Sequence, residues 1–204
     1  MNPTIAYPFK RGIYLNITNR CPTACRFCIK RILNWRFERW NFRLAGGEPS
    51  VAKILAAVSV VAKRKAFKEV VFCGYGENTF RLPEMLKICR ALRSRWPRTT
   101  LRLNTVGLGN LIWKRDIAAD LAGALDAVAV SLNTADPAQW LEIHAPLRRF
   151  RADGFASALG FIRSCVGAGL RTTVTAVKLP GVDLDAVRRL AGSLGASFRP
   201  RPVL

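Results

Sequence analysis

The sequence is poor in acidic residues and has no long apolar run. It carries 13 Asp and Glu against 33 Lys and Arg, for a formal net charge of +20 over 204 residues. The longest mostly apolar stretch, residues 54–62, is far shorter than the roughly 20 residues of a membrane-spanning helix. The first residues show no basic leader followed by an apolar segment. We therefore expect a soluble, cytoplasmic protein without a membrane partner.

Acidic residues are scarcest in the first half. Residues 1–115 hold 23 basic and 5 acidic residues, whereas residues 116–204 hold 10 and 8. A genome rich in arginine codons would spread this excess evenly. The uneven charge favours an acidic partner such as a nucleic acid, because a basic field attracts phosphates. Both explanations remain open from composition alone.

Apolar, β-branched runs alternate with helical patterns along the chain, which is typical of parallel strands covered by helices. The strands are expected at 12–19, 69–74, 100–105, 127–133, 172–178 and 197–199, and the helices at 50–65, 82–96, 111–121, 155–168 and 184–194. Six such units fit this length, while an eight-unit barrel needs about 250 residues. We predict an α/β fold, a partial (β/α)6 open barrel forming a single domain over residues 1–204. A flat doubly wound sheet is the alternative, and either fold binds ligands at the carboxyl ends of its strands.

Three of the six cysteines stand close together, directly after the first expected strand. Cys21, Cys25 and Cys28 can surround one centre from a single loop. Thiolates are the ligands that iron–sulfur clusters prefer, and three of them leave one iron of a 4Fe–4S cluster open. A structural zinc needs four ligands, and neither a second cysteine pair nor a nearby histidine exists. A disulfide framework is disfavoured without a secretion signal.

The other cysteines and the single histidine have less specific surroundings. Cys73 is expected in a buried strand, and Cys89 and Cys165 on apolar helix faces, where cysteine acts as a small hydrophobic residue. With no second cysteine cluster, we expect no auxiliary iron–sulfur centre. We expect His144 at the surface end of a helix, with a role as proton donor as the alternative.

The spacing Cys-x-x-x-Cys-x-x-Cys after the first strand of a partial barrel resembles the radical S-adenosylmethionine (radical SAM) enzymes, over essentially the whole chain. The phrases YLNITNRCPTACRFC, VVFCGYGEN and AVAVSLNTADP resemble more narrowly the TatD-nuclease-linked radical SAM proteins. The resemblance implies a 4Fe–4S cluster on Cys21, Cys25 and Cys28, with S-adenosylmethionine on the open iron. It further implies reductive cleavage to a 5′-deoxyadenosyl radical, with the electron supplied by an external donor of flavodoxin or ferredoxin type.

The resemblance also implies contacts with S-adenosylmethionine. Phe27 matches an aromatic position near the adenine, although it could instead cap the loop. Two segments compete for the Gly-Gly-Glu-Pro motif that receives the amino group. Residues 46–49 match it letter for letter but follow no expected strand, whereas Gly76 and Glu77 follow the strand at 69–74. We choose Gly76 and Glu77, because glycine allows close approach and a carboxylate pairs with an ammonium. Glu48 then becomes a helix N-terminal acid.

Further positions follow the next strand ends. Asn104, with Thr105 and Gly107, and then Ser131 and Asn133 match places where family members bind the ribose or carboxylate of the cofactor. Each could instead form a turn through its own side chain. The segment 177–181 matches an adenine-side segment.

A basic, aromatic segment follows the cysteines. Six basic residues alternate with four aromatic ones: Arg26, Lys30, Arg31, Arg36, Arg39 and Arg43 with Trp35, Phe37, Trp40 and Phe42. Such a mixture binds single-stranded nucleic acid by stacking and phosphate pairing. The same mixture can form a flap that shields a reactive cluster from solvent, and we favour this second interpretation.

The substrate stays unassigned from the sequence. A six-unit chain leaves little room for a substrate domain, so we expect a large partner, a nucleic acid or a protein. Two other functions remain as alternatives: a nucleic-acid-binding module with a structural cluster, and a partner that places a radical on another protein.

Overall fold

The computed structural model describes residues 3–203, and its chain forms two compact units. Unit 1 consists of the chain up to Cys21, residues 29–104 and residues 124–126. Unit 2 consists of residues 22–28, residues 105–123 and the chain from Ala127 on.

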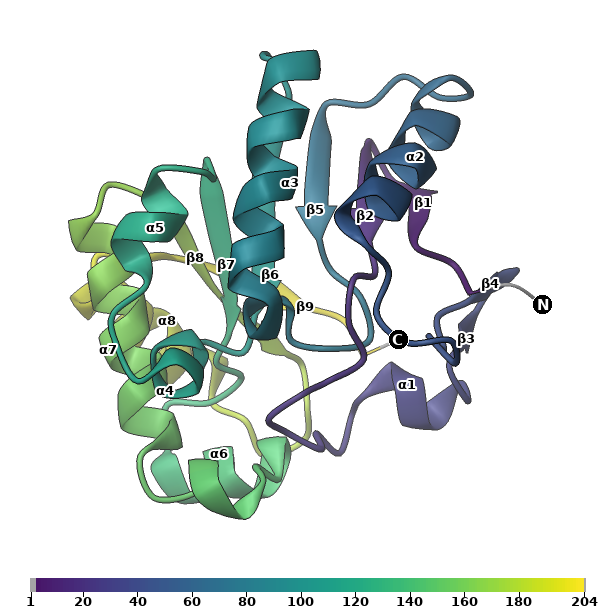
Figure 1. Ribbon diagram of the computed structural model, residues 1–204. Coiled ribbons are helices and arrows are strands. Elements are labelled where there is room, and N and C mark those ends of the chain that lie inside the picture. The colour runs from purple at the N-terminus through teal and green to yellow at the C-terminus, as the bar shows by residue number, and fades with distance from the viewer. Residues whose placement is uncertain (1–2, 204) are drawn as a thin grey trace. The chain divides into compact units, whose positions relative to one another are not determined.

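The helices and strands alternate in both units (Figure 1). The elements of unit 1 are β1 (Ala6–Phe9), β2 (Gly12–Leu15), α1 (Ile29–Ile32), β3 (Arg36–Phe37), β4 (Trp40–Asn41), α2 (Val51–Ala62), β5 (Glu69–Phe72), the 3-10 helix η1 (Asn78–Arg81), α3 (Leu82–Arg95) and β6 (Thr100–Thr105), whose last residue is assigned to unit 2. The elements of unit 2 are α4 (Gly109–Trp113), α5 (Ala118–Ala122), β7 (Ala127–Ser131), α6 (Pro137–His144), the 3-10 helix η2 (Arg148–Phe150), α7 (Gly154–Gly167), β8 (Arg171–Val177), α8 (Leu184–Ser193) and β9 (Ser197–Arg201).

The sheet of unit 1 consists of three parallel strands and of β1, which pairs with β2 in antiparallel register. β2 pairs with β5 and β5 with β6 in parallel register, which aligns Leu15 with Phe72 and Phe72 with Leu103. These three apolar side chains are fully buried. Helix α2 packs against β1 and β2 and beside α3 (Figure 1). Its first turn is capped by Ser50, whose hydroxyl accepts the Lys53 amide.

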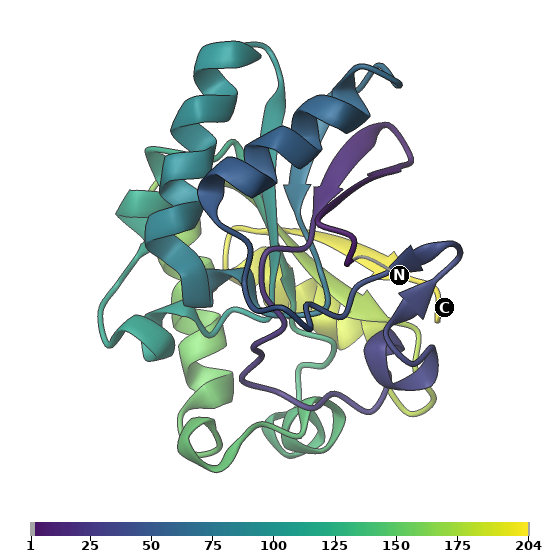
Figure 2. The same cartoon turned by 45° about the vertical axis from the view of Figure 1, so that its right-hand side comes forward.

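Unit 2 repeats the same construction. β7 pairs with β8 and β8 with β9, again in parallel, and Figure 2 shows β8 and β9 side by side in green and yellow. Helix α7 packs on β8, and α8 packs on β8 and β9. Asp183 caps α8 by accepting the amides of Asp185 and Ala186. Gly169 and Gly195 follow the ends of α7 and α8 with φ of 81° and 73°, in the left-handed region that glycine tolerates.

The expectation of an α/β fold with parallel strands is confirmed in both units. The short elements β1, α1, β3 and β4 were not expected, because their sequences have no clear apolar period. A helix ending at His144 was expected, but without bounds, and it is α6. The helix expected at 111–121 is wrong as one element: it divides into α4 and α5. Lys114 breaks it with a left-handed φ of 52°, and Asp116 starts α5 by accepting the Ala118 amide.

No helix in residues 3–203 is long and apolar enough to cross a membrane. The expectation of a single domain stays a prediction.

Candidate functional site

Two asparagines after β2 hold the segment that leads to the cysteines. The amide of Asn16 is buried, donates to the carbonyls of Thr4 and Phe42, and accepts the Tyr75 amide. Asn19 donates to the same Phe42 carbonyl and accepts the Leu44 amide at 2.7 Å. The sequence pattern gave no indication of these roles, since the partners lie up to 59 residues away.

The cysteine loop itself, residues 22–28, is anchored on the end of α6. The Ala24 amide donates to the His144 carbonyl at 3.0 Å, and the Arg26 amide donates to the Ile143 carbonyl at 3.0 Å. The Leu147 amide donates back to the Pro22 carbonyl at 2.9 Å. Backbone bonds of this kind fix the course of the loop whatever its side chains carry.

The three thiols of the loop are the type of ligand that an iron–sulfur cluster prefers. Cys25 is buried, while Cys21 and Cys28 are half-buried. All six cysteines lie within the described chain, and none of them forms a disulfide. Across residues 3–203, however, no three His, Cys, Asp or Glu side chains are arranged to hold a metal ion. Cys21 belongs to unit 1, and Cys25 and Cys28 belong to unit 2. The donor chemistry of the three thiols fits the cluster.

His144 is fully buried, so the expectation of a surface histidine is wrong. Trp140 and Ile143 share its side of α6, and this face packs inward because its residues lie three and four apart. The His144 ring stacks on Trp140 at a centroid distance of 4.7 Å. Burial lowers the pKa of His144 to about 4, which outweighs the opposing hydrogen bond with Leu132.

Two polar groups and Cys25 surround the His144 ring. Its Nδ1 lies 3.5 Å from Cys25 Sγ, and its Nε2 lies 3.1 Å from Asn133 Nδ2. The Leu132 carbonyl is 3.2 Å from the same Nε2. The half-buried Phe27 meets the ring edge-on at 6.2 Å, so it lies on the inner side of the loop. Its contact with adenine stays a prediction.

Gly76 and Glu77 lie beyond the carboxyl end of β5, against the segment before Cys21. The Glu77 amide donates to the Arg20 carbonyl at 2.8 Å. A Cβ at Gly76 would collide with the carbonyls of Thr18 and Arg20. Glycine is thus needed here for the approach of two backbone segments, a reason different from the expected approach to a ligand. The role of Gly76 in binding the cofactor stays a prediction.

The carboxylate of Glu77 is buried and caps η1. It accepts the Thr79 amide at 3.2 Å and the Thr79 hydroxyl at 2.8 Å. The next residue, Asn78, is also buried, and within residues 3–203 neither polar atom of its side chain has a hydrogen-bond partner. An unsatisfied buried amide costs about 1–3 kcal/mol, which marks a place where a polar ligand or water can bind.

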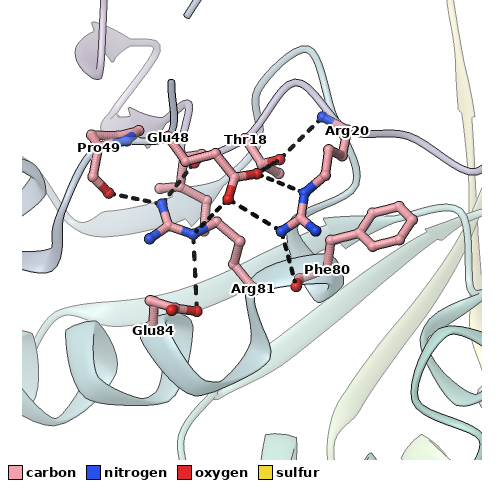
Figure 3. A network of polar contacts seen from close by, with 8 residues as sticks. Thr18, Arg20, Glu48, Pro49, Phe80, Arg81 and Glu84 are labelled. Atoms are coloured by element: carbon pink, nitrogen blue, oxygen red, sulfur yellow. Dashed lines mark hydrogen bonds and ion pairs between the residues drawn. The ribbon is translucent and has the colours of Figure 1, made fainter. Parts of the chain in front are cut away.

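Glu48 is not a helix N-terminal acid, and this expectation is wrong. The carboxylate lies before the N-cap of α2 and binds the side chains of Thr18, Arg20 and Arg81 (Figure 3). Burial alone would raise the pKa of Glu48, but these hydrogen bonds and the two guanidinium charges hold it below its usual value. Arg81 is buried and also donates to the carbonyls of Ile17 and Pro49 at 2.9 and 2.8 Å.

Asn104 and Thr105 end β6 with different partners. Asn104 is half-buried and accepts Arg102 Nη1 at 2.6 Å, while Arg102 pairs with Glu69. The Thr105 hydroxyl accepts the Gly107 amide at 3.0 Å, which is the turn-forming alternative. Gly107 has a φ of 82°. Contact of Asn104 with the cofactor stays a prediction.

Ser131 and Asn133 follow β7 and differ in exposure. The half-buried Ser131 hydroxyl lies 3.4 Å from Thr175 Oγ1 and accepts Arg201 Nη2 at 3.3 Å. Asn133 is fully buried, and its Oδ1 accepts the Val177 amide at 3.0 Å. Both ends of the Asn133 amide therefore have partners inside unit 2, and these partners lie 44 and 11 residues away, so the side chain does not form a local turn. Contact of Ser131 and Asn133 with the cofactor stays a prediction.

The family model described as "Radical SAM superfamily" matches residues 15–194. The chain belongs to the radical SAM superfamily. This membership confirms the expectation of an enzyme of that family, whose cofactors are S-adenosylmethionine and a 4Fe–4S cluster. The narrower resemblance to the TatD-nuclease-linked proteins stays a prediction. No curated protein matches the chain in sequence.

Solved structures of radical SAM proteins share the fold. A radical SAM methyltransferase from Sphaerobacter thermophilus is 17% identical with a TM-score of 0.68, over 97% of this chain and 57% of its own. Streptococcus suis SuiB bound to S-adenosylmethionine is 14% identical with a TM-score of 0.65, over 96% and 41%. The methyltransferase TsrM from Kitasatospora setae, with cobalamin and a [4Fe-4S] cluster bound, is 17% identical with a TM-score of 0.54, over 89% and 35%.

This radical SAM chain thus spans 57% or less of the length of these solved chains. The likeness in structure establishes the partial-barrel fold expected from the sequence and leaves substrates and partners undecided.

The basic segment of unit 1 turns its aromatic residues inward. Trp35, Phe37 and Trp40 pack against a buried cluster of Tyr7, Tyr14, Phe42, Val71 and Tyr75. The expectation that no strand precedes residues 46–49 is wrong, since β3 and β4 pair in antiparallel register. The arginines stay outside, and Arg39 lies over the Trp40 ring at 4.5 Å. The three rings are half-buried and already packed on this cluster, so the geometry of this segment favours the flap.

Two of the remaining cysteines, Cys89 and Cys165, are inert thiols. Burial raises the pKa of Cys89 and of Cys165 to about 12, and both side chains lie on the inward faces of α3 and α7. Cys73 is half-buried and follows the end of β5, so its expected place within a buried strand is wrong.

Proposed function

We propose that the chain is a radical SAM enzyme core in which Cys21, Cys25 and Cys28 hold one 4Fe–4S cluster and Gly76 and Glu77 orient S-adenosylmethionine. When bound, the cluster and S-adenosylmethionine would supply reductive cleavage of the sulfonium. The observation that carries the proposal is the cysteine loop. Its Cys-x-x-x-Cys-x-x-Cys spacing follows the carboxyl end of β2, and backbone bonds fix residues 22–28 on the end of α6.

The chain's own residues would prepare this site in two ways. Gly76 brings the loop after β5 against the residues before Cys21, which orders the backbone without a ligand. The unsatisfied amide of Asn78 offers a donor and an acceptor to a polar group. Both features support a cofactor site after β5 rather than at residues 46–49, where the carboxylate of Glu48 is already bound by two arginines.

Anaerobic reconstitution tests the proposal. We expect about four irons per wild-type chain and formation of 5′-deoxyadenosine after addition of dithionite and S-adenosylmethionine. Cys28→Ala should lose both, whereas Cys89→Ala, a matched control on the buried face of α3, should keep both. A chain that binds zinc instead, or a Cys28→Ala variant with unchanged iron content, contradicts the proposal.

We further propose an external one-electron donor of flavodoxin or ferredoxin type, and a large acidic substrate, a nucleic acid or a protein. The basic excess of residues 1–115 supports an acidic partner, and Lys63, Arg64 and Lys65 form an exposed basic run after α2. Binding of a single-stranded RNA oligonucleotide and of an acidic flavodoxin, measured over a salt series, separates the two kinds of partner. A binding affinity that does not change with salt concentration contradicts both kinds of acidic partner. A single core domain and a cytoplasmic location belong to the same proposal.

A further inference from the structure

We infer that His144 is a positioning residue for the iron–sulfur site: its Nδ1–H donates a hydrogen bond to Cys25 Sγ, and Asn133 selects the tautomer that can donate. This inference rests on the proposed function, in which Cys25 is an iron ligand. It concerns a residue that lies 119 positions along the chain from Cys25.

The geometry of the three side chains carries the inference. His144 Nδ1 is 3.5 Å from Cys25 Sγ, a normal length for a hydrogen bond to sulfur, and His144 Nε2 is 3.1 Å from Asn133 Nδ2. Cys25, Asn133 and His144 are all buried, so water does not compete for these groups. Thr23 Oγ1 lies 3.4 Å from the same sulfur and gives it a second polar neighbour.

The orientation of Asn133 decides which nitrogen of the ring carries the proton. Its Oδ1 accepts the Val177 amide at 3.0 Å, so its Nδ2 must face His144. An amide nitrogen only donates, and Nε2 can accept from it only without a proton of its own. The proton of the neutral ring then sits on Nδ1, which faces Cys25.

The other tautomer has one partner as well. With the proton on Nε2, the ring would donate to the Leu132 carbonyl at 3.2 Å, and Nδ1 would accept from the Cys25 thiol. A thiolate has no proton to give, so iron ligation by Cys25 removes this alternative. Iron ligation by Cys25 therefore favours the Nδ1–H tautomer.

The surroundings hold the ring in place. Trp140 stacks on it at 4.7 Å with an interplanar angle of 22°, and the His144 carbonyl accepts the Ala24 amide of the cysteine loop. Asn133 has a φ of 67°, a left-handed conformation that asparagine tolerates better than most residues. Partners of this kind tune the electronic properties of a metal site through its ligands.

The hydrogen bond has a defined effect on the cluster. A donor to a ligating sulfur stabilises the more negative, reduced state of an iron–sulfur cluster, which raises its reduction potential. Loss of the donor should lower the reduction potential without removing any ligand.

Substitutions at His144 test this effect on the reconstituted chain. His144→Phe keeps a flat ring against Trp140 but has no donor, whereas His144→Asn places an amide nitrogen near the position of Nδ1. EPR-monitored redox titration should give His144→Phe a tenfold smaller reduction equilibrium constant, which is about 59 mV for one electron. His144→Asn should recover much of the loss. Leu141→Ala, on the exposed side of the same helix, should match the wild type. Equal shifts in His144→Phe and His144→Asn overturn the inference, because they indicate lost packing.

A second measurement needs no variant. The chain has one histidine, so ¹⁵N-histidine labels a single residue. Pulsed EPR of the reduced wild-type cluster should detect a ¹⁵N coupling and an exchangeable proton at the sulfur ligand. A cluster with normal iron content but without these couplings overturns the inference alone. Failure of the wild type to bind iron overturns the proposed function, and the inference with it.

Discussion

At the scale of single residues, burial decides which thiols can react. Cys21 and Cys28 are half-buried, Cys25 is buried, and Cys89 and Cys165 are buried with a pKa of about 12. Since the thiolate is the nucleophile, only roughly one in ten thousand of the latter thiols is reactive at pH 8. Exposure and ionisation thus divide these five chemically identical groups into reactive and inert ones.

Alkylation of the cluster-free chain should follow this division. At pH 8, iodoacetamide should modify Cys21 and Cys28 first, Cys25 slowly, and Cys89 and Cys165 only on unfolding. Mass spectrometry of the peptides measures the order. After reconstitution, Cys21, Cys25 and Cys28 should all be protected, and labelling of Cys28 that is unchanged by iron and sulfide would argue against its role as a ligand.

Glu48 connects charge to stability at the same scale. Glu48→Gln removes the negative partner of the buried Arg81 and should lower the free energy of unfolding by about 1–3 kcal/mol at pH 7. The contribution of the more exposed Arg20 is screened by solvent. Because the pKa of Glu48 is lowered in the folded state, its stabilisation is present above the unfolded value of about 4.3 and is lost as the pH falls through the folded value.

Urea unfolding of wild type and Glu48→Gln at pH 7 and pH 3 measures this difference. It should be large at pH 7 and shrink toward pH 3. Glu84→Gln is the control, because Glu84 reaches Arg81 only at 3.9 Å and should change stability by less than about 0.5 kcal/mol. A gap between wild type and Glu48→Gln that widens in acid would contradict the assignment.

At the scale of elements, the loops after β2 and β5 depend on one close approach. Gly76→Ala places a Cβ against the backbone carbonyls of Thr18 and Arg20 and should cost about 1–3 kcal/mol of unfolding free energy. Gly46→Ala is the matched control, since a Cβ there meets nothing within 4 Å, and we expect a change within about 0.5 kcal/mol. Denaturant titration compares the two variants. Equal stabilities would show that the loops can separate without cost.

Helix α6 is an element that the apolar pattern of the sequence does not reveal. It spans only Pro137–His144, too short for a clear apolar period, so its bounds and its buried face were not expected. Its N-cap Asp136, which accepts the Gln139 amide at 2.6 Å, and Pro137 at the first turn were available signals. Because the sequence shows no apolar period here, it does not indicate that His144 lies on the buried face of the helix.

At the scale of the whole molecule, cluster binding should stabilise the fold. A group that binds the folded chain and not the unfolded one raises the apparent free energy of unfolding by mass action. We expect the reconstituted wild type to melt several degrees above the cluster-free chain, and removal of iron by a chelator to reverse the shift. Calorimetry under argon measures both states, with Cys28→Ala as the variant that should show no shift. A wild-type shift of the same size with iron and sulfide omitted would exclude the cluster as its cause.

The sequence by itself determined the features that are local along the chain. The cysteine spacing is set by eight consecutive residues, and alternating apolar runs predicted five of the strands within a few residues of their ends. The period of the apolar residues indicates which face of an element is buried, and this period can be read from the sequence alone.

Only the tertiary structure decided the surroundings of the site. His144 meets Cys25 across 119 residues, Asn16 meets Tyr75 across 59, and Arg20 meets Glu48 across 28. No local pattern encodes such pairs, because burial and hydrogen-bond partners depend on which segments the packing brings together. For this reason a histidine expected at the surface and an acid expected at a helix start became a buried neighbour of a thiol and the partner of two arginines.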